Sequence, residues 1–233
     1  MRTHLLLTVA IVALGAPADA ATRNFGITDF TKIRVSGPYK VSLATDVPPF
    51  ARASGSSAGL DRVLVEVRGD TLVVQSNPSW GGYPGEDPGP VEVTVGTHDL
   101  TNASLIGSGS LGIDRVKSQK FTLTIQGSGA SQIGSLTADQ LSVSLEGTAN
   151  AKLAGEVGKV TALVRGVSTL DAASLATPSA DIDADGSATI DANVTDMAKV
   201  NAWGPATVRL SGGPTCTLKV QGSTTVSGCR STQ

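Results

Sequence analysis

The chain has 233 residues and a formal net charge of -2, and 16% of its residues are charged. This balance provides no basic surface for nucleic acid or for an anionic membrane, so neither is an expected partner. Glycine is abundant, with 27 residues, but it follows no three-residue period, which excludes a collagen-like structure. The length is sufficient for one or two domains with a buried core.

The first 20 residues have the composition of a secretory signal peptide. Arg2 supplies a positive charge, residues 5–14 form a short apolar segment, and residues 18–20 match the A-x-A pattern of a cleavage site. No later segment reaches the ~20 apolar residues that a transmembrane helix needs. We therefore expect a soluble mature chain that begins at Ala21 and is exported to the periplasm, the cell surface or the medium.

Residues 21–99 form an N-terminal region in which the short repeat of the later chain is not evident. Alternating and β-branched residues predict strands at residues 33–35, 39–43, 62–67, 71–74 and 91–95. Gly69 lies in a short turn between two of these strands, which predicts a β-hairpin. Residues 77–90 are rich in glycine and proline and are expected to form an exposed loop. We expect this region to cover the open edge of the repeats that follow.

Residues 100–233 contain a repeat of 18 to 20 residues. Its marker is a glycine followed by small residues, and it recurs at intervals of 20, 20, 19, 20, 18 and 18 residues. The seven leading glycines are Gly107, Gly127, Gly147, Gly166, Gly186, Gly204 and Gly222. Apolar and polar residues alternate on both sides of each glycine, which predicts two short strands with one buried face.

So short a unit cannot bury its apolar face alone, and stacking on its neighbours solves this problem. The sequence therefore predicts an all-β fold, a parallel β-helix of about seven coils, right-handed like most parallel crossovers. Equivalent residues of successive coils should form internal ladders. One predicted ladder consists of Leu123, Val143, Ala162, Ile182, Val200 and Leu218.

The segment from Phe30 to Val41 resembles the opening motif of the bacterial GIN domain, also called the putative autotransporter adhesin head domain. Residues 60–63 and 69–74 and the Gly-Ser-Gly repeats match as well, so the resemblance covers residues 30–226. The later repeats depart from the pattern, because their second glycine is replaced. The resemblance implies an exported all-β protein with a β-helical body and no established catalytic residues.

Asp181, Asp183 and Asp185 precede Gly186 with the spacing of the first ligands of an EF-hand loop. The twelfth position of that loop requires a bidentate glutamate and is Ala192 here. The strand period places the three aspartates on one outward face, ~6.6 Å apart, so their side chains diverge. We interpret them as a solvated polar face, with a weak surface cation site as the alternative. No cofactor is expected.

The remaining chemistry points away from catalysis. The Gly-Ser-Gly segments lack the following helix that phosphate loops need, and two cysteines with one mature histidine, His98, disfavour a zinc site. His98 also has no sequence context that suggests a catalytic triad. We expect a non-catalytic envelope or surface protein that acts by adhesion or as a scaffold, with an envelope protein or a glycan as partner.

The alternative function is a carbohydrate-active β-helix enzyme, either a polysaccharide lyase or a glycosidase. Such an enzyme would use two carboxyl groups, and the three aspartates could supply them. Exposed aromatic residues are the other candidates for a binding surface, namely Trp80, Tyr83 and Trp203. Local packing of the Gly/Pro-rich loop is the alternative role of the first two.

Cys216 and Cys229 lie near the end of the chain. Export would place both in an oxidising compartment, where a pair of cysteines usually forms a bridge. An intramolecular bridge would fasten the final coil and is worth ~3 kcal/mol in the chain-entropy model. Two free thiols or an intermolecular bridge are the alternatives.

Overall fold

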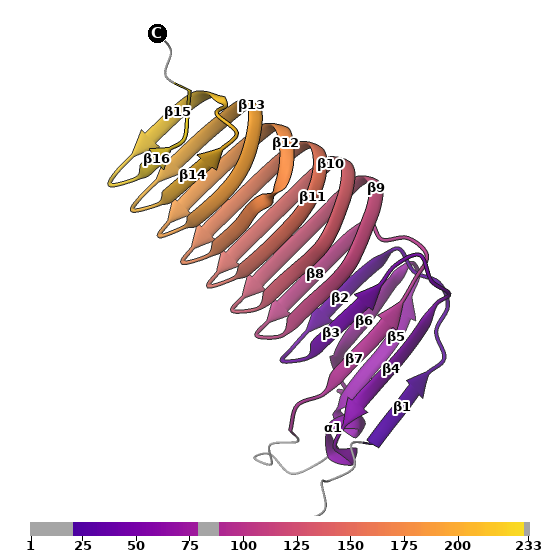
Figure 1. Ribbon diagram of the computed structural model, residues 1–233. Helices are drawn as coiled ribbons and strands as arrows, with labels where there is room; N and C mark the ends of the chain where they lie inside the picture. Colours follow the sequence, from indigo (N-terminus) through magenta and orange to yellow (C-terminus); the bar gives the residue numbers. More distant parts are fainter. Residues whose placement is uncertain (1–20, 79–88, 231–233) are drawn as a thin grey trace, which may run out of the picture.

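Stacked parallel strands form the body of the protein in the computed structural model, which describes residues 21–78 and 89–230 (Figure 1). The strands of this body are β8 (Asn102–Gly107), β9 (Ser110–Gly127), β10 (Ala130–Gly147), β11 (Asn150–Gly166), β12 (Thr169–Gly186), β13 (Thr189–Trp203), β14 (Thr207–Ser211), β15 (Thr215–Gln221) and β16 (Thr225–Ser227). Each long strand starts after one glycine bend, curves around the opposite edge and ends at the next bend. The predicted parallel β-helix is confirmed, with about six turns where seven coils were expected.

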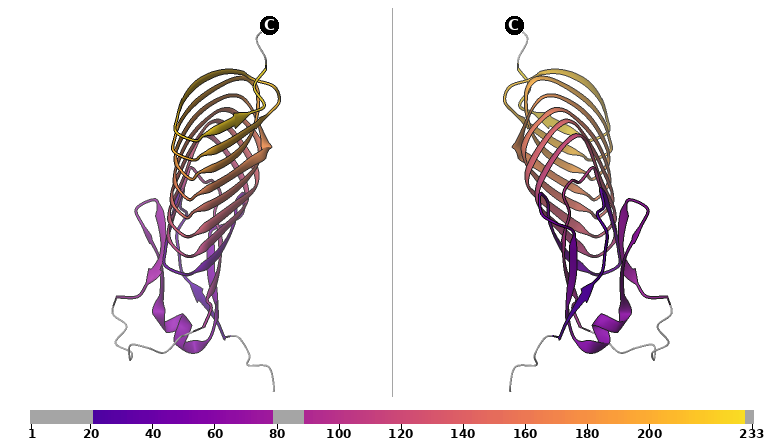
Figure 2. Two further views of the ribbon diagram at one scale, coloured as in Figure 1. Left: turned by 90° about the vertical axis from the view of Figure 1, so that its left-hand side faces the viewer. Right: turned by 90° about the vertical axis from the view of Figure 1, so that its right-hand side faces the viewer.

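Each coil is flattened, with two long sides that meet at the narrow glycine bend and at a broad curved edge (Figure 2). We call face A the side formed by the segments that precede each glycine, such as residues 121–126. Face B is formed by the segments that follow it, such as residues 130–133. Side chains alternate between the interior and the solvent on both faces, as the burial of β9 and β10 shows.

The predicted internal ladder is confirmed. Val143 pairs with Leu123 on one side and with Ala162 on the other, and the register continues through Ile182 and Val200 to the last coil. These five side chains are at most 3% exposed. Like residues therefore stack on like in the dry interior, which consists mainly of valine, leucine, isoleucine and alanine.

The glycine bends stack as well, because each one needs a backbone conformation that side chains disfavour. The φ angles of the seven leading glycines lie between 81° and 113°. At Gly147 a Cβ atom would lie 2.6 Å from the carbonyl oxygen of Gly127, the equivalent residue of the preceding coil. Both the conformation and the close approach therefore require glycine at this position.

Variation in repeat length is absorbed mostly at the broad edge. The register between β10 and β11 shifts between Ile133 and Leu136, and that between β12 and β13 shifts between Ala172 and Ala176. The glycine bends and the two faces keep their register through these shifts. A repeat of 18 or 19 residues can therefore follow one of 20 without displacing the internal ladders.

The N-terminal region contributes coils of its own, a difference from the expected simple cap. Its elements are β1 (Ala21–Phe25), β2 (Lys32–Ser36), β3 (Lys40–Ala44), β4 (Phe50–Gly55), α1 (Ser57–Arg62), β5 (Val63–Arg68), β6 (Thr71–Ser76) and β7 (Glu92–Gly96). The pair β2 and β3 continues the solenoid: β2 pairs with β8, and β3 pairs with β9, both in parallel. Gly37 joins the glycine stack, with a φ of 114°.

The order of these coils in space differs from their order in the sequence. Strands β6 and β7 pair in parallel with the other edges of β2 and β3. The coil made by residues 32–44 thus lies between one made by later residues and the solenoid body. The predicted hairpin is confirmed as β5 and β6, with Gly69 at a φ of 65°.

Antiparallel strands and a short helix close the N-terminal end. β5 covers the edge of β6 on face A, while β4 and then β1 cover the edge of β7 on face B. Ser56 caps the N-terminus of helix α1, its hydroxyl accepting a hydrogen bond from the Gly59 N–H, and the helix buries Leu60 against the core. The sequence pattern did not indicate α1, β1 or β4. Along the described ranges, no helix is long and apolar enough to cross a bilayer.

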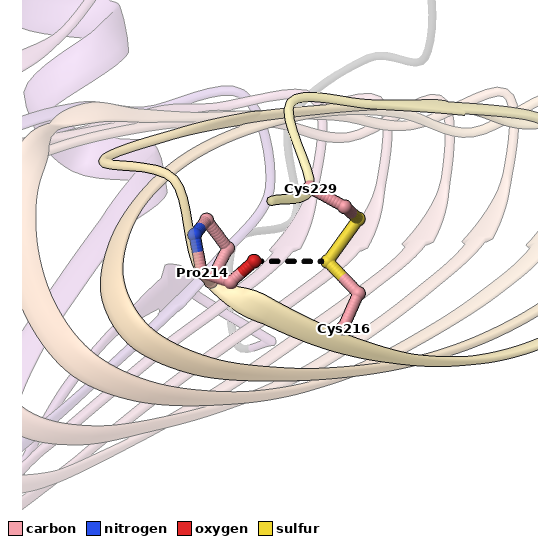
Figure 3. Close-up of a disulfide and its surroundings, with 3 residues drawn as sticks. All are labelled: Pro214, Cys216 and Cys229. Carbon is pink, nitrogen blue, oxygen red and sulfur yellow. Dashed lines mark hydrogen bonds between the residues drawn. A yellow bond between two sulfur atoms is a disulfide. The ribbon is translucent and has the colours of Figure 1, made fainter. Parts of the chain in front are cut away.

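A disulfide fastens the last coil, as predicted (Figure 3). Cys216, at the start of β15, bonds to Cys229 after β16, with the two Cα atoms 5.7 Å apart. The backbone N–H of Arg230 also donates a hydrogen bond to the Pro214 carbonyl at 2.9 Å. The chain is thereby returned across the end of the solenoid.

The internal ladder predicts a severe effect of Val143→Asp. The new carboxylate would lie in the dry interior without a partner, which costs several kcal/mol, a large part of a typical stability. We expect loss of the cooperative thermal transition in circular dichroism. Ser144→Asp is the matched control, because Ser144 is the next residue of the strand and its side chain points outward. This variant should keep a β-sheet spectrum. A stable Val143→Asp variant would contradict the register.

The glycine stack predicts that Gly147→Ala lowers the free energy of unfolding by about 1–3 kcal/mol. Gly112→Ala is the control, since its φ is not positive and its Cβ would lie 3.9 Å from the Val41 carbonyl oxygen. Chemical denaturation followed by fluorescence or circular dichroism measures both. Equal midpoints for the two variants would show that the bend does not need glycine.

Candidate binding surfaces

A shallow groove with a volume of about 410 Å³ crosses face B. It runs over five neighbouring strands, from β3 across β9, β10 and β11 to β12. Its lining includes the outward-facing residues Lys40, Ser42, Ser110, Gly112, Ala130, Gln132, Asn150, Lys152, Thr169 and Asp171. Larger hollows of about 740 and 660 Å³ lie along the broad edge, so the groove is distinguished by its run across five strands of face B and not by its volume.

The floor of the groove is low because several outward positions carry short side chains. Ser42 and Gly112 are two of these, and together with the longer Gln132 they occupy equivalent positions of three successive coils. Gly112 differs from the bend glycines, because a Cβ there would meet only the Val41 carbonyl oxygen at an ordinary 3.9 Å. The backbone therefore does not require glycine at this position, and the absence of a side chain leaves the groove open there.

The charges at the ends of the groove are paired. Lys40 forms an ion pair with Glu92 at 2.7 Å, and Lys152 forms one with Asp171 at 3.1 Å. The hydrogen bond from Lys152 is the main cause that lowers the pKa of Asp171, and the backbone N–H of Ala173 contributes. Between these pairs the groove offers hydroxyl and amide groups without net charge.

The outward column that contains Lys152 and Asp171 continues beyond the groove with another ion pair. Arg209 on β14 donates two hydrogen bonds to Asp191 on β13, at 2.6 and 2.9 Å. This contact raises the pKa of Arg209. Face B therefore presents neutralised charges and small polar groups over most of its length, and lacks a strong field of either sign.

The three aspartates lie on face A, on the opposite side of the solenoid from the groove. Asp181 forms an ion pair with Lys159 at 2.6 Å, and Asp183 accepts a hydrogen bond from Asn201 at 2.6 Å. Asp185 is in register with Arg165 and with Trp203. Residues of the neighbouring coils thus engage the carboxylates one by one, and within residues 21–78 and 89–230 no three ligand-type side chains gather around a common centre.

Trp203 ends β13 on the outward side of face A and is 42% exposed. It lies beside Asp185 in the register of β12 and β13. Trp80 and Tyr83, the other aromatic candidates, lie outside the described residues. Because Trp203 lies on face A, the packed interior separates it from the groove on face B.

His98 has an acidic partner that sequence reasoning missed. Its Nδ1 lies 3.0 Å from Asp29 Oδ2, and its backbone N–H donates to Asp29 Oδ1. The Thr97 hydroxyl donates to Asp29 Oδ1 at 2.9 Å and also contacts the Phe30 carbonyl. Because this hydroxyl is directed at Asp29 and not at the imidazole, the cluster joins two loops and does not form a nucleophile–base pair.

The sequence missed the Asp29–His98 contact because the partners are 69 residues apart and no motif marks them. The groove did have a signal. Alignment of the repeats on their bend glycines places Ser110 and Ala130 in one outward column and Gly112 and Gln132 in the next. The short residues of these columns could have been identified in the sequence.

The fold and these surfaces define a class of protein: a β-solenoid with polar outer faces and a closed aliphatic interior. The chain belongs to the family described as "Putative auto-transporter adhesin, head GIN domain", whose model matches residues 29–214. The matched range ends one residue before β15, so the disulfide-linked last coil lies beyond it. A search of curated proteins found no match to this chain.

Solved structures with the same fold include the following two. A putative adhesin from Bacteroides fragilis superimposes with a TM-score of 0.83 at 21% identity, covering 90% of this chain and 97% of its own. A putative lipid binding protein from Parabacteroides distasonis gives a TM-score of 0.68 at 20% identity, covering 89% and 95%. At these identities the likeness concerns the fold.

The Asp29 cluster predicts a pH dependence of stability. The hydrogen bond from Thr97 is the main cause that lowers the pKa of Asp29 below its usual value, and contacts from His98 act in the same direction. A lowered pKa in the folded state means that the contribution is present above the pKa of the unfolded chain, ~3.9, and is lost as the pH falls through the folded pKa.

The matched variant is Asp29→Asn, which removes the titrating group. Thermal unfolding should show the wild type more stable than the variant at pH 6, and the difference should disappear near pH 2.5. A difference that persists unchanged at the lower pH would show that the Asp29 charge has no role in it.

Proposed function

We propose that this protein is an exported, non-catalytic binding head that holds an extended glycan in the groove on face B. The observation that carries the proposal is the groove itself: a mostly apolar floor edged by hydroxyl and amide groups, between two neutralised ion pairs. Ser42, Gln132 and Asn150 offer donors and acceptors suited to sugar hydroxyls. A neutral lining favours a ligand that is rich in hydrogen-bonding groups and carries little charge.

The shape of the groove supports an extended ligand. It crosses five strands, and four inter-strand spacings of about 4.8 Å give a length of ~19 Å. The in-register parallel strands repeat similar polar groups at this spacing along the axis. A linear polymer with a regular repeat could contact several coils in the same way, which suits adhesion to a cell-surface polysaccharide.

Three observations support export and a surface location. The first 20 residues match a signal peptide, although they lie outside the described residues. The disulfide Cys216–Cys229 is typical of an oxidising compartment. The family of the chain is described as an adhesin head domain. These features support a location in which external or envelope glycans are accessible to the groove.

The contacts of the aspartates favour binding over glycoside cleavage. Hydrolysis needs two carboxyl groups on either side of the scissile bond. Asp181 and Asp183 instead project side by side from one strand and are engaged by Lys159 and Asn201. The interior is filled with stacked aliphatic side chains, so a polar ligand on the outer face also fits this chain better than an enclosed lipid chain.

The proposal predicts that Gly112→Tyr abolishes glycan binding while the fold is retained. The tyrosine ring would fill the groove floor, and its Cβ meets no backbone atom closer than 3.9 Å. Wild-type protein and variant are compared on a glycan array, with thermal stability as the check of folding. Ser144→Tyr on face A is the matched control and should bind like the wild type.

Two outcomes would contradict the proposal. Binding of the same glycans by Gly112→Tyr at wild-type strength would remove the groove from the binding surface. Release of reducing or unsaturated ends from a bound polysaccharide would indicate an enzyme, and substitution of Asp183 by asparagine would then be the test of the alternative site on face A.

A further inference from the structure

The last coil leaves apolar side chains of the internal ladder uncovered. Leu218 and Val220 on β15 have inward phase, yet they are 46% and 39% exposed. Their equivalents in the preceding coil, Val200 and Ala202, are fully buried. The difference arises because no described strand pairs with the outer edge of β15. Both an open strand edge and an apolar row are therefore presented at this end.

The opposite end of the solenoid is protected in the manner of a natural sheet edge. Arg23 on β1 is in register with buried Ala53, so it occupies the inward phase of the edge strand. Its guanidinium donates to the Leu60 carbonyl at 2.7 Å and to Asp61 Oδ1 at 2.6 Å. An inward-pointing charge of this kind blocks further strand addition. On β15 the charge is carried by Lys219, which faces outward, and the inward row of the strand carries none.

We propose that β15 pairs with β15 of a second copy, in antiparallel orientation about a two-fold axis at Leu218. This inference goes beyond the proposed glycan binding and does not depend on it. The register pairs all seven residues of the strand, from Thr215 to Gln221. It places Leu218 against its own copy and Val220 opposite Cys216, so the inward row of each coil meets the inward row of the other.

Charge supports this register and this partner. Lys219 is the charged residue of β15, and in the two-fold register it lies opposite Thr217 and not opposite its own copy. A partner must bring an open strand edge with an apolar inward row. The C-terminal edge of a second copy brings both. Stacking the two ends of the solenoid head to tail would instead bring β1, with Arg23 in its inward row, against the face B side of the last coil. The assembly therefore closes as a dimer and does not grow into a filament.

The test changes the charge at Thr217. In the monomer this side chain faces solvent, and in the proposed dimer it lies opposite Lys219 of the second copy. Thr217→Lys creates two lysine–lysine contacts across the axis, and Thr217→Glu creates two glutamate–lysine contacts. We expect the dimer dissociation constant in sedimentation equilibrium to rise roughly tenfold in the first variant and to fall in the second. Gln140→Lys and Gln140→Glu, on exposed Gln140 of the solenoid body, are matched controls and should leave it unchanged.

Leu218→Lys provides a second measurement and should give a monomer, with the disulfide confirmed by mass spectrometry and the β-sheet spectrum retained. The proposal is overturned if the wild-type chain stays monomeric up to ~100 µM, or if its mass grows beyond that of a dimer. It is also overturned if the two Thr217 variants shift the dissociation constant in the same direction, or if Leu218→Lys remains dimeric.

Discussion

The stacked glycine bend is the constraint on which the rest of the structure depends. Each bend has a left-handed backbone conformation and approaches the preceding bend so closely that a Cβ would collide with its carbonyl oxygen, as at Gly147. Since every coil must turn at this point, the residues on both sides are fixed in register with the coils next to them. The internal ladders, the outward columns and the polar groove all follow from that alignment.

Much of the solenoid could be predicted because its information is local and repeated. Alternation around each glycine identified the inward row that includes Val143 and Ile182, and the position of the cysteines indicated the bridge. The coil formed by residues 32–44 could not be predicted in the same way. Its neighbours, β6 with β7 and β8 with β9, lie up to 70 residues further along the chain, and no pattern in the sequence states that order.

The outer surface was harder to interpret because alternation identifies only which side chains face outward. Whether an outward column forms a ridge or a groove depends on the side-chain sizes in neighbouring coils. On face B the absence of a side chain at Gly112 makes it a groove. The aspartates of face A show the same dependence on neighbours: their predicted polar face is present, but Lys159 and Asn201 determine what each carboxylate contacts. Such a surface is determined by the side chains at equivalent positions of neighbouring coils, and a single sequence motif does not describe them.

The out-of-order coil has a consequence for how the protein folds and resists force. A solenoid built in sequence order can add or lose repeats from either terminus. Here residues 32–44 are clamped between strands that are synthesised later, so their pairing must wait for long-range contacts, which are slow to form. Once formed, this arrangement resists peeling beyond the edge strand β1 from the N-terminal side, because a pull on β2 must break two parallel pairings together. Fraying is thereby directed to the C-terminal coil, where Cys216–Cys229 limits how far the chain can unwind.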